Sequence, residues 1–370
     1  MNVGFDAKRA FHNYAGLGNY SRLLIQSLSE QYSDNQYFLF TPGFTPHPLH
    51  SFAEKDNCKI ITPKGIHKVL PSSFWRSFSM ANEIKRQKID IFHGLSGELP
   101  VSNLKVPKVV TIHDLIFMRY PDYYSAFDRK MYEKKFRYAC KIADKIITIS
   151  KQTADDCIKF LNADAKKIEI GYQSCDPIFS ASVMDKTISK KYDLPEKFIL
   201  NIGTMEARKN LLNLVKAMHF VEEDISLVAI GRRTFYTSVV EKFAKDTHIS
   251  HRVKLMHNIP FQDFPSIYAA ASAFVYPSVF EGFGIPVLEA LTVGTPTATS
   301  NISSMPEVGG GAVLYFNPNH IEDIAYRISL LLHDKEIVKE LNVNRLKQLE
   351  KFSINKIAEK TNEIYGLLGC

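Results

Sequence analysis

Two glutamates separated by seven residues flank a glycine turn in the second half of the chain. Residues 277–290 read PSVFEGFGIPVLEA, with Glu281 in the loop and Glu289 in the helix whose first turn suits Pro286. Folded over the turn, both carboxylates can face one elongated polar ligand. The amides of Gly282–Gly284 stand at the helix start, where backbone N–H groups bind a diphosphate. The alternative is a pair of solvent-exposed glutamates beside a tight turn.

A pair of cations, Arg208 and Lys209, follows another strand end. Residues 203–210 read GTMEARKN and lie between an apolar strand and a helix. Two adjacent cations at a helix N-terminus oppose the helix dipole, which favours negative charge there. An anion bound at this point would explain the arrangement, and a solvated surface pair is the alternative.

The first half offers a glycine loop, Gly16-Leu17-Gly18-Asn19, after the first strand. Glycines let a ligand approach the backbone closely, and the N–H groups of a helix start favour an anion. Ser21 stands where the dinucleotide fingerprint has its third glycine, and no strand ending in Asp or Glu follows at the usual interval of about 20 residues. A binding loop and a plain turn therefore fit this segment about equally well.

His113 and Asp114 end the apolar strand Val109–Ile112. A polar pair at the carboxyl end of a central strand faces the ligand crevice of an open parallel sheet. There His113 can donate a hydrogen bond to a ligand oxygen or pass a proton. The alternative is that His113 caps the next segment and Asp114 starts a turn.

These residues need a scaffold, and the chain supplies one of alternating strands and helices. The expected strands are Val3–Asp6, Tyr37–Thr41, Lys59–Thr62, Ile89–Phe92, Val109–His113, Lys145–Ile149, Ile168–Tyr172, Phe198–Ile202, Ser226–Ile230, Val253–Met256, Ala273–Tyr276, Thr295–Thr299 and Ala312–Phe316. The expected helices include Asn19–Gln31, Phe74–Lys88, Asp128–Ala143 and Gln152–Leu161. This alternation is typical of right-handed βαβ crossovers. It predicts an α/β protein with two doubly wound Rossmann-like domains facing a central cleft.

The boundary between the domains is expected between Ser174 and Lys197, where the pattern lapses into a polar stretch. We therefore predict domains at 1–178 and 179–352, each large enough for a core of its own. The last helix, within 353–370, has no strand after it, and we expect it to pack back on the first domain.

Composition excludes several classes of protein. The 370 residues are 45% apolar and 23% charged, a composition that argues against disorder. The formal net charge of +7 suits a phosphate-bearing ligand or an anionic membrane surface, and solubility alone would also explain it. Five cysteines without a Cys-x-x-Cys pair fit a reducing cytosol. No signal peptide or membrane-spanning segment is visible, and the basic residues are too dispersed for a nucleic-acid surface.

Taken together, these motifs resemble the retaining glycosyltransferases of family 4. The likeness spans nearly the whole chain and rests on GLGNY at 16–20, TIHDL at 111–115, residues 203–210 and the Glu-x7-Glu motif. It implies the two-Rossmann GT-B fold, with the acceptor on the first domain and a nucleotide-diphospho-sugar on the second. The strings around residues 113–123 and 208–210 look most like members that use GDP-mannose.

The resemblance implies donor-binding roles for the second domain. Glu281 would bind hydroxyls of the donor sugar, and Glu289 would bind the ribose hydroxyls. Gly282, Phe283 and Gly284 would hold the sugar and the phosphates through main-chain amides.

The cation pair matches the basic residues that neutralise the leaving diphosphate in this family. Thr204 stands where many members have arginine, so that duty would fall on Arg208 and Lys209. Because no Asp-x-Asp pair occurs anywhere in the chain, we expect a metal-independent reaction with no cofactor.

In the first domain, His113 matches a histidine near the reacting sugar. Gly16, Gly18 and Asn19 match the loop that closes over the phosphates of the donor. The predicted activity is transfer of a hexosyl group, with mannosyl favoured, from a nucleotide-diphospho-sugar to a glycan or lipid-linked acceptor in cytoplasmic polysaccharide biosynthesis.

Two other functions compete with this one. An NAD-dependent dehydrogenase would need the third glycine and an acid at the end of the second strand, and the chain has neither. A sugar-nucleotide epimerase or a sugar-nucleotide-binding protein on the same fold remains the alternative.

A peripheral membrane contact is a further hypothesis. Lys64, His67 and Lys68 precede the segment FWRSF at 74–78, and a basic stretch beside exposed aromatics can dock on anionic lipid. The alternative is that these aromatics pack a helix into the core.

Overall fold

The computed structural model describes residues 1–65, 71–101, 104–181 and 185–369. The chain divides into two compact units, one made of Met1–Ser174 and Ser353–Cys370 and the other of Cys175–Phe352. The boundary between residues 174 and 175 lies close to the expected one between 178 and 179. The last helix belongs to the first unit, although the whole second unit precedes it in the sequence.

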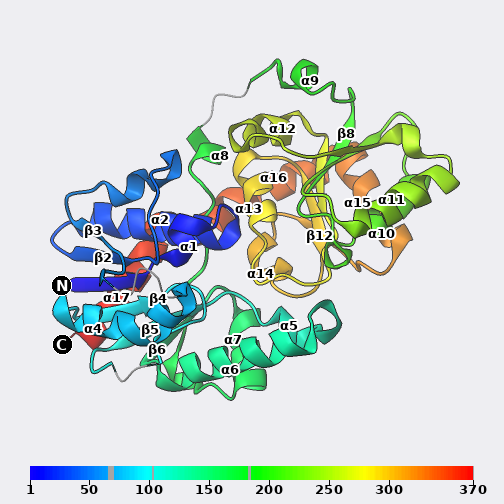
Figure 1. Cartoon of the computed structure of the whole chain (residues 1–370). Helices are drawn as coiled ribbons and strands as arrows, with labels where there is room; N and C mark the ends of the chain where they lie inside the picture. The colour runs from blue at the N-terminus through cyan, green and yellow to red at the C-terminus, as the bar shows by residue number, and fades with distance from the viewer. Residues whose placement is uncertain (66–70, 102–103, 182–184, 370) are drawn as a thin grey trace. The chain divides into compact units, whose positions relative to one another are not determined.

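The first unit is built on a parallel sheet, which in the described part of the chain has seven strands in the order β3-β2-β1-β4-β5-β6-β7 (Figure 1). The strands are β1 (Asn2–Asp6), β2 (Gln36–Phe40), β3 (Cys58–Ile61), β4 (Ile91–Gly94), β5 (Lys108–Ile112), β6 (Lys145–Thr148) and β7 (Ile168–Ile170). The strands expected in the first half are confirmed with small shifts at their ends. Val109, Val110 and Ile112 are fully buried, which explains the continuous apolar runs of a sheet covered on both faces.

Helices cover both faces of this sheet. They are α1 (Lys8–His12), α2 (Gly16–Gln31), α3 (Ser72–Phe74), α4 (Met80–Arg86), α5 (Ile116–Arg119), α6 (Ala126–Ile142), α7 (Lys151–Leu161) and α17 (Ile354–Leu368). One apolar core joins the sheet to α1, α2 and α17, and a second joins it to α4, α6 and α7. The helix expected over 74–88 is interrupted, because a π-helical turn at Trp75–Ser79 joins α3 to α4.

The second unit repeats the architecture with a parallel sheet of six strands among the described residues, in the order β10-β9-β8-β11-β12-β13. The strands are β8 (Phe198–Ile202), β9 (Ser226–Ile230), β10 (Val253–Met256), β11 (Ala273–Tyr276), β12 (Thr297–Ser300) and β13 (Leu314–Phe316). The helices are α8 (Ile178–Ala181), α9 (Ile188–Lys191), α10 (Leu211–Ala217), α11 (Phe235–Asp246), α12 (Phe264–Ala270), α13 (Ile285–Val293), α14 (Met305–Gly309), α15 (Ile321–His333) and α16 (Lys335–Leu349).

Each sheet has one point at which the strand order reverses. In the first unit it lies between β1 and β4, and in the second unit between β8 and β11. Open parallel sheets bind ligands beyond the carboxyl ends of the strands at such a point. The segments 203–210 and 277–290, which follow β8 and β11, therefore stand where the second unit is expected to bind its ligand.

A buried polar chain anchors α17 to the first sheet. The hydroxyl of Tyr365 lies 2.6 Å from His93 Nδ1, and His93 Nε2 lies 2.8 Å from the hydroxyl of Thr111. All three residues are fully buried. Burial lowers the pKa of His93 to about 3, so the imidazole is neutral at neutral pH. The hydrogen bonds then satisfy polar atoms that have no access to water.

We predict that Tyr365→Phe lowers the free energy of unfolding of the first unit by about 1–3 kcal/mol, because His93 Nδ1 would lose its buried partner. Tyr326→Phe is the matched control. Because Tyr326 is 57% exposed on α15, loss of its hydroxyl should change the free energy of unfolding little. Urea unfolding of both variants measures the difference. Equal midpoints would contradict the anchoring role of Tyr365.

Candidate active site

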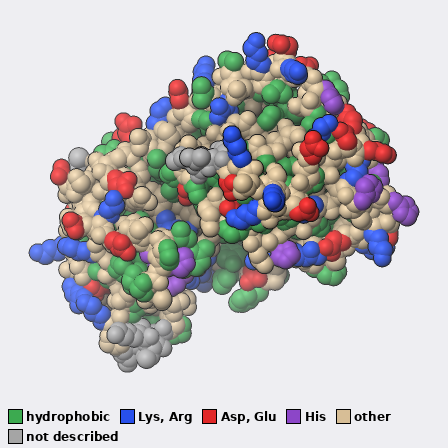
Figure 2. All heavy atoms as spheres, turned by 90° about the horizontal axis from the view of Figure 1, so that it is seen from above, with side chains coloured by type: hydrophobic (Ala, Val, Ile, Leu, Met, Phe, Trp, Pro, Cys, Tyr) green, Lys and Arg blue, Asp and Glu red, His purple; other side chains and the backbone are tan. Residues whose placement is uncertain are grey.

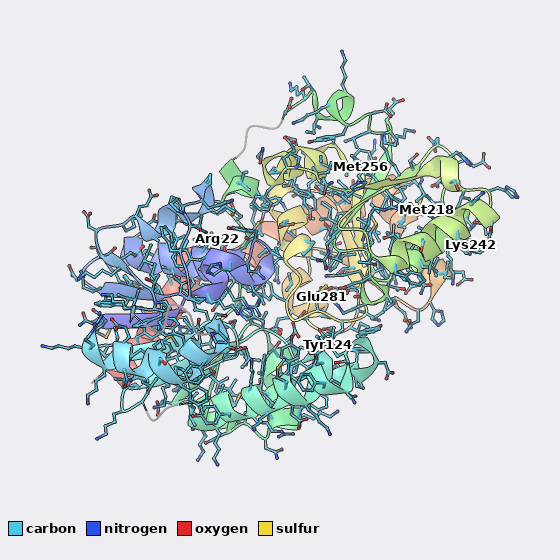
Figure 3. All side chains as sticks on the ribbon, viewed as in Figure 1. Arg22, Tyr124, Met218, Lys242, Met256 and Glu281 are labelled. Atoms are coloured by element: carbon cyan, nitrogen blue, oxygen red, sulfur yellow. The ribbon has the colours of Figure 1, made fainter. Side chains whose placement is uncertain are left out.

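Glu281, labelled in Figure 3, lies in the loop between β11 and α13 and contacts a cluster of buried and partly buried polar side chains. Its Oε1 atom accepts hydrogen bonds from Ser278 Oγ at 2.6 Å, Lys209 Nζ at 2.6 Å and the Tyr276 hydroxyl at 3.0 Å. Its Oε2 atom lies 2.7 Å from a guanidinium nitrogen of Arg208. The sequence-predicted cation pair and the first glutamate of the motif are therefore in direct contact.

The charges of this cluster set the ionisation of Glu281. Burial alone would raise its pKa, but Lys209 and Arg208 outweigh burial and lower the pKa to about 2. Burial in turn lowers the pKa of Lys209, an effect that the Glu281 carboxylate partly opposes. Glu281 is thus a carboxylate throughout the physiological pH range, with two cations held against it.

Arg208 and Lys209 lie on a single 3-10 turn, Ala207–Lys209, rather than in the first turn of an α-helix. The reason is Asn210, which adopts a left-handed conformation with φ 58° and separates the turn from α10. Its side-chain amide donates to the carbonyl oxygens of Pro277 and Pro318 at 3.2 and 2.8 Å. The expectation of cations at a helix start is therefore corrected to cations on the turn that precedes it.

The backbone of the glutamate loop is held by two serines that the sequence analysis did not single out. Ser303 Oγ accepts from the Glu281 amide at 3.1 Å and donates to the Glu281 carbonyl at 2.7 Å. Ser304 Oγ approaches the Phe283 carbonyl at 2.6 Å. Both serines follow β12, the strand beside β11, so the only signal in the sequence was their place after a strand end.

Gly284 has a backbone conformation that requires glycine. Its φ is +119°, and a Cβ atom there would lie 2.5 Å from the Met305 side chain. The residue caps α13 at its N-terminus. The expected turn at Gly282–Gly284 is confirmed as the start of this helix, whereas phosphate binding by its amides stays a prediction.

Glu289 lies in the middle of α13 and has different surroundings. The Tyr268 hydroxyl donates to its Oε2 atom at 2.9 Å. Burial raises the pKa of Glu289 to about 7, which the Tyr268 hydrogen bond partly opposes and the nearby Asp176 carboxylate increases. The two motif glutamates therefore differ: Glu281 is always charged, and Glu289 titrates near neutral pH.

In the first unit, His113 follows β5 and is buried. One ring nitrogen, Nε2, lies 2.9 Å from the Leu95 carbonyl, and Nδ1 lies 3.0 Å from the side-chain amide nitrogen of Gln173. A carbonyl only accepts, so Nε2 carries the proton and Nδ1 accepts from Gln173. Burial lowers the pKa of His113 to about 4, so the ring is neutral at neutral pH.

The glycine loop opens α2, as expected, and its two glycines differ in how much space a side chain would have. A Cβ atom on Gly18 would lie 1.6 Å from the Asn13 carbonyl oxygen, so packing alone demands glycine there. A Cβ atom on Gly16 would meet nothing within 4 Å. The side chain of Asn19 accepts from Arg22 within the same helix. Contact of Gly16, Gly18 and Asn19 with a nucleotide-sugar donor stays a prediction. Of the two glycines, Gly16 is the one that packing does not explain.

Family models match both units. The model "Glycosyltransferase Family 4" matches residues 14–177, and the model "Glycosyl transferases group 1" matches residues 184–348. The O-antigen chain mannosyltransferase B of Escherichia coli is 30% identical over 285 residues, covering 75% of this chain and 74% of that protein. The O-antigen chain mannosyltransferase RfbU of Salmonella typhimurium is 30% identical over 216 residues, covering 57% of each chain.

Solved structures show the same fold at low sequence identity. HepE of Anabaena, in a complex with UDP-glucose, superposes with a TM-score of 0.77 over 99% of both chains at 15% identity. Sucrose-phosphate synthase of Thermosynechococcus elongatus gives a TM-score of 0.76 at 18% identity, covering 100% of this chain and 99% of that one. The chain therefore belongs to glycosyltransferase family 4, and it is a hexosyltransferase built on the GT-B fold.

Proposed function

We propose that the protein is a retaining mannosyltransferase that moves mannose from GDP-mannose to a glycan or lipid-linked acceptor. The observation that carries this proposal is the contact of Glu281 with Arg208 and Lys209 at the point where the strand order of the second sheet reverses. The choice of mannose is supported by the names of the relatives, which include O-antigen chain and serotype-specific mannosyltransferases.

The cluster has the groups that a nucleotide-diphospho-sugar needs. Lys209 and Arg208 are the cations that would face the diphosphate. Three hydrogen-bond donors already contact Oε1 of Glu281, whereas Oε2 is paired with Arg208 alone in the hydrogen bonds and ion pairs given above. A sugar hydroxyl would therefore be bound through Oε2. Glu289 would accept from the ribose hydroxyls, and Gly282–Gly284 would lie along the phosphates.

The chemistry follows from where charge develops. Breaking the bond between the anomeric carbon and the phosphate oxygen leaves a nucleoside diphosphate, and cations fixed beforehand stabilise that charge in the transition state. We propose that Arg208 and Lys209 do this without a metal ion. If the acceptor attacks from the face that the diphosphate leaves, a phosphate oxygen takes the acceptor proton. His113 is neutral, and because both its ring nitrogens already have partners, Leu95 and Gln173, a hydrogen bond to the reacting sugar would have to replace one of these contacts.

The alternatives of an epimerase or a binding protein are not favoured. The relatives named above are transferases, and family models for transferases match both units. We place the reaction in the cytoplasm, as the free thiols of Cys58, Cys140 and Cys157 fit a reducing compartment; Cys370 lies outside the described residues.

The membrane hypothesis needs a correction. Trp75 and Arg76 of the segment 74–78 are buried, and Arg76 is paired with Asp6 at 2.5 Å, so neither can touch a lipid surface. Phe74 and Phe78 are 45% and 52% exposed, with ring centroids 5.2 Å apart. His67 and Lys68 lie outside the described residues. No helix in the described ranges is long and apolar enough to cross a membrane.

Charged side chains of both signs are interspersed on one face of the protein. Figure 2 shows Lys and Arg side chains spread among Asp and Glu side chains over the face that it displays. We propose that a lipid-linked acceptor is approached through the exposed pair Phe74 and Phe78, with the exposed cations Lys64 and Lys85 before and after this pair in the sequence.

The proposed activity predicts that the purified protein binds GDP-mannose in a screen of nucleotide sugars. With a suitable glycan acceptor, mass analysis should show addition of one hexose and release of GDP. Activity should persist in excess chelator, because the two cations perform the charge stabilisation. Activity that is lost in chelator and restored by magnesium or manganese would contradict the metal-independent mechanism.

Single substitutions supply the control for this assay. Lys209→Ala should slow turnover by about 10²–10³, the usual cost of removing one donor aimed at developing charge. Lys242→Ala is the matched control, since Lys242 is a solvent-exposed lysine on α11 (Figure 3). Equal rates for the two variants would remove Lys209 from the site.

Substitutions of the two motif glutamates should affect binding of the nucleoside diphosphate differently. Glu289→Gln should weaken GDP binding, because Glu289 would hold the ribose, which is the same in the ground and transition states. Glu281→Gln should keep GDP binding near the wild-type value and lose turnover instead, because Glu281 would contact the transferred sugar. The reverse pattern would mean that the assigned orientation of the donor is backwards.

The pH dependence sharpens this test. Below pH 7 the wild-type Glu289 is protonated and resembles glutamine, and above pH 7 it is a carboxylate, given its pKa of about 7. The ratio of the GDP dissociation constants of Glu289→Gln and wild type should therefore rise from pH 5.5 to pH 8.5. Ionisation of GDP itself cancels in the ratio, and a constant ratio would contradict the role of the carboxylate.

Membrane contact is tested by sedimentation with vesicles that contain anionic lipid. The wild type should sediment with them at low salt and less at high salt, and Phe74→Ser with Phe78→Ser should reduce sedimentation. Leu367→Ala, at a 71% exposed residue of α17, is the control for loss of an exposed apolar side chain. Absence of salt-sensitive binding by the wild type would retire the membrane contact.

A further inference from the structure

A cavity of about 290 Å³ lies in the second unit at the amino ends of two neighbouring strands. Pro296 stands just before β12 and Ala312 just before β13, and both line the cavity. The Glu281 cluster, made of Glu281, Arg208 and Lys209, follows the carboxyl ends of β11 and β8. Because β8, β11, β12 and β13 run parallel, the cavity and the Glu281 cluster lie at opposite edges of the sheet. The cavity is therefore separate from the edge at which the sheet is expected to bind its donor.

Three cations line the cavity, and all of them come from α16. Lys335 and Lys339 are exposed lysines about one helical turn apart, and Arg345 is half-buried. Among the described residues, the lining contains no carboxylate. Neither lysine side chain has an ion pair or a hydrogen bond within the described part of the chain. Both ammonium groups are therefore available to a ligand.

The carboxylates of α16 do not neutralise these cations. At about 100° per residue, Glu336 and Glu340 project from the side of the helix opposite to the cavity. Asp334 caps the helix, and its side chain accepts from the amides of Glu336 and Ile337 at 3.1 and 3.0 Å. Even when Asp334 is counted against the three cations, an excess of two positive charges remains beside the cavity. The positive end of the α16 dipole, at Lys335, adds to that excess.

Arg345 joins the cavity to α13, the helix that carries Glu289 (Figure 1). Its Nη1 atom donates to the carbonyl oxygens of Leu291 and Thr292 at 2.9 and 3.3 Å, in the last turn of α13. These contacts place a positive charge at the negative end of the helix dipole, where α13 has no basic residue of its own. The other terminal nitrogen, Nη2, has no hydrogen-bond partner among the described residues and can donate to a ligand. The guanidinium is thus held in place before a ligand binds.

The rest of the lining is largely apolar. Leu291, Leu341 and Ala312 are buried, and Val338 is half-buried. A cavity with apolar walls and a few charged groups binds a ligand that has an apolar body and a charged end. Small-molecule sites typically have volumes of ~300–1,000 Å³, and this cavity lies near the lower limit. It therefore suits a small organic anion rather than a lipid chain.

We propose that this cavity binds a small, water-soluble phosphate monoester at a site separate from the Glu281 cluster. The phosphate would lie between the ammonium groups of Lys335 and Lys339 and Nη2 of Arg345, and the organic group would pack on Leu291 and Leu341. A phosphate monoester carries about 1.5–2 negative charges at pH 7, which matches the excess of positive charge beside the cavity. A sulfonate of similar shape carries a single charge and satisfies the cations less well. The site does not depend on the proposed transferase reaction.

A pair of double variants tests the site. Lys335→Ala with Lys339→Ala removes both ammonium groups, and the fold should survive because neither side chain has a partner among the described residues. Lys242→Ala with Lys347→Ala is the matched control, since it removes the same charge from two exposed lysines of the second unit that do not line the cavity. Thermal midpoints of the full chain check that both variants are folded.

The probes are phenyl phosphate, inorganic phosphate, benzenesulfonate and phenol, each titrated calorimetrically into the full chain without nucleotide. Wild type and the control variant should bind phenyl phosphate equally well, and the cavity variant should bind it at least tenfold more weakly. Inorganic phosphate and benzenesulfonate should each bind wild type at least fivefold more weakly than phenyl phosphate, and phenol should not bind. No binding of phenyl phosphate to wild type, equal binding by the two double variants, or tighter binding of benzenesulfonate would overturn the proposal.

Two further measurements identify the place and the source of the phosphate. Lys209→Ala should bind phenyl phosphate as wild type does, because Lys209 lies at the other edge of the sheet. Binding that is lost in Lys209→Ala and kept in the cavity variant would assign the phosphate to the Glu281 cluster and overturn the proposal. Sedimentation with vesicles that contain phosphatidic acid tests a lipid headgroup. Sedimentation that requires Lys335 and Lys339, without binding of phenyl phosphate, would overturn the proposal of a water-soluble ligand.

Discussion

The second unit depends on one carboxylate held between two cations. Each of Glu281, Arg208 and Lys209 loses hydration on burial, a cost of several kcal/mol per ion, which is offset because all three are in contact. Removal of one partner from such a group typically costs about 3–5 kcal/mol. The cluster therefore fixes the loop after β8 against the loop after β11 before a ligand binds, and charges fixed in advance are what the proposed stabilisation of a leaving diphosphate requires.

The fold was predictable from the sequence because its sheets are parallel and covered on both faces. Such strands are continuous apolar runs, and β8, β9 and β10 have the bounds expected from the sequence alone. That Arg208 and Glu281 lie together was predictable for a related reason, although their role in binding stays a prediction. Polar residues that follow apolar strands lie at one edge of the sheet, so Arg208 and Glu281 could be assigned to a ligand site from their place in the chain.

Other features depend on contacts between distant segments, which a single sequence does not show. Arg76 looked like part of a basic aromatic surface, yet it is buried against Asp6, 70 residues earlier in the chain. Ser303 holds both the amide and the carbonyl of Glu281 from a loop 22 residues later. Gln173 donates to Nδ1 of His113 from 60 residues away. In each case the partner is determined by tertiary structure rather than by local sequence.

The contrast between the two motif glutamates has the same origin. Glu281 and Glu289 belong to one short segment, but their pKa values of about 2 and about 7 differ because only Glu281 meets cations from the loop after β8, 72 residues earlier. Parallel pairing of β8 with β11 brings those two loops to the same edge of the sheet. Glu289 lies on the following helix, where burial, Tyr268 and Asp176 govern its pKa. The spacing of the motif therefore puts one carboxyl group in the loop and one on the helix. The pairing of β8 with β11 brings cations to Glu281 alone, so Glu281 is always charged, whereas Glu289 can change its charge near neutral pH.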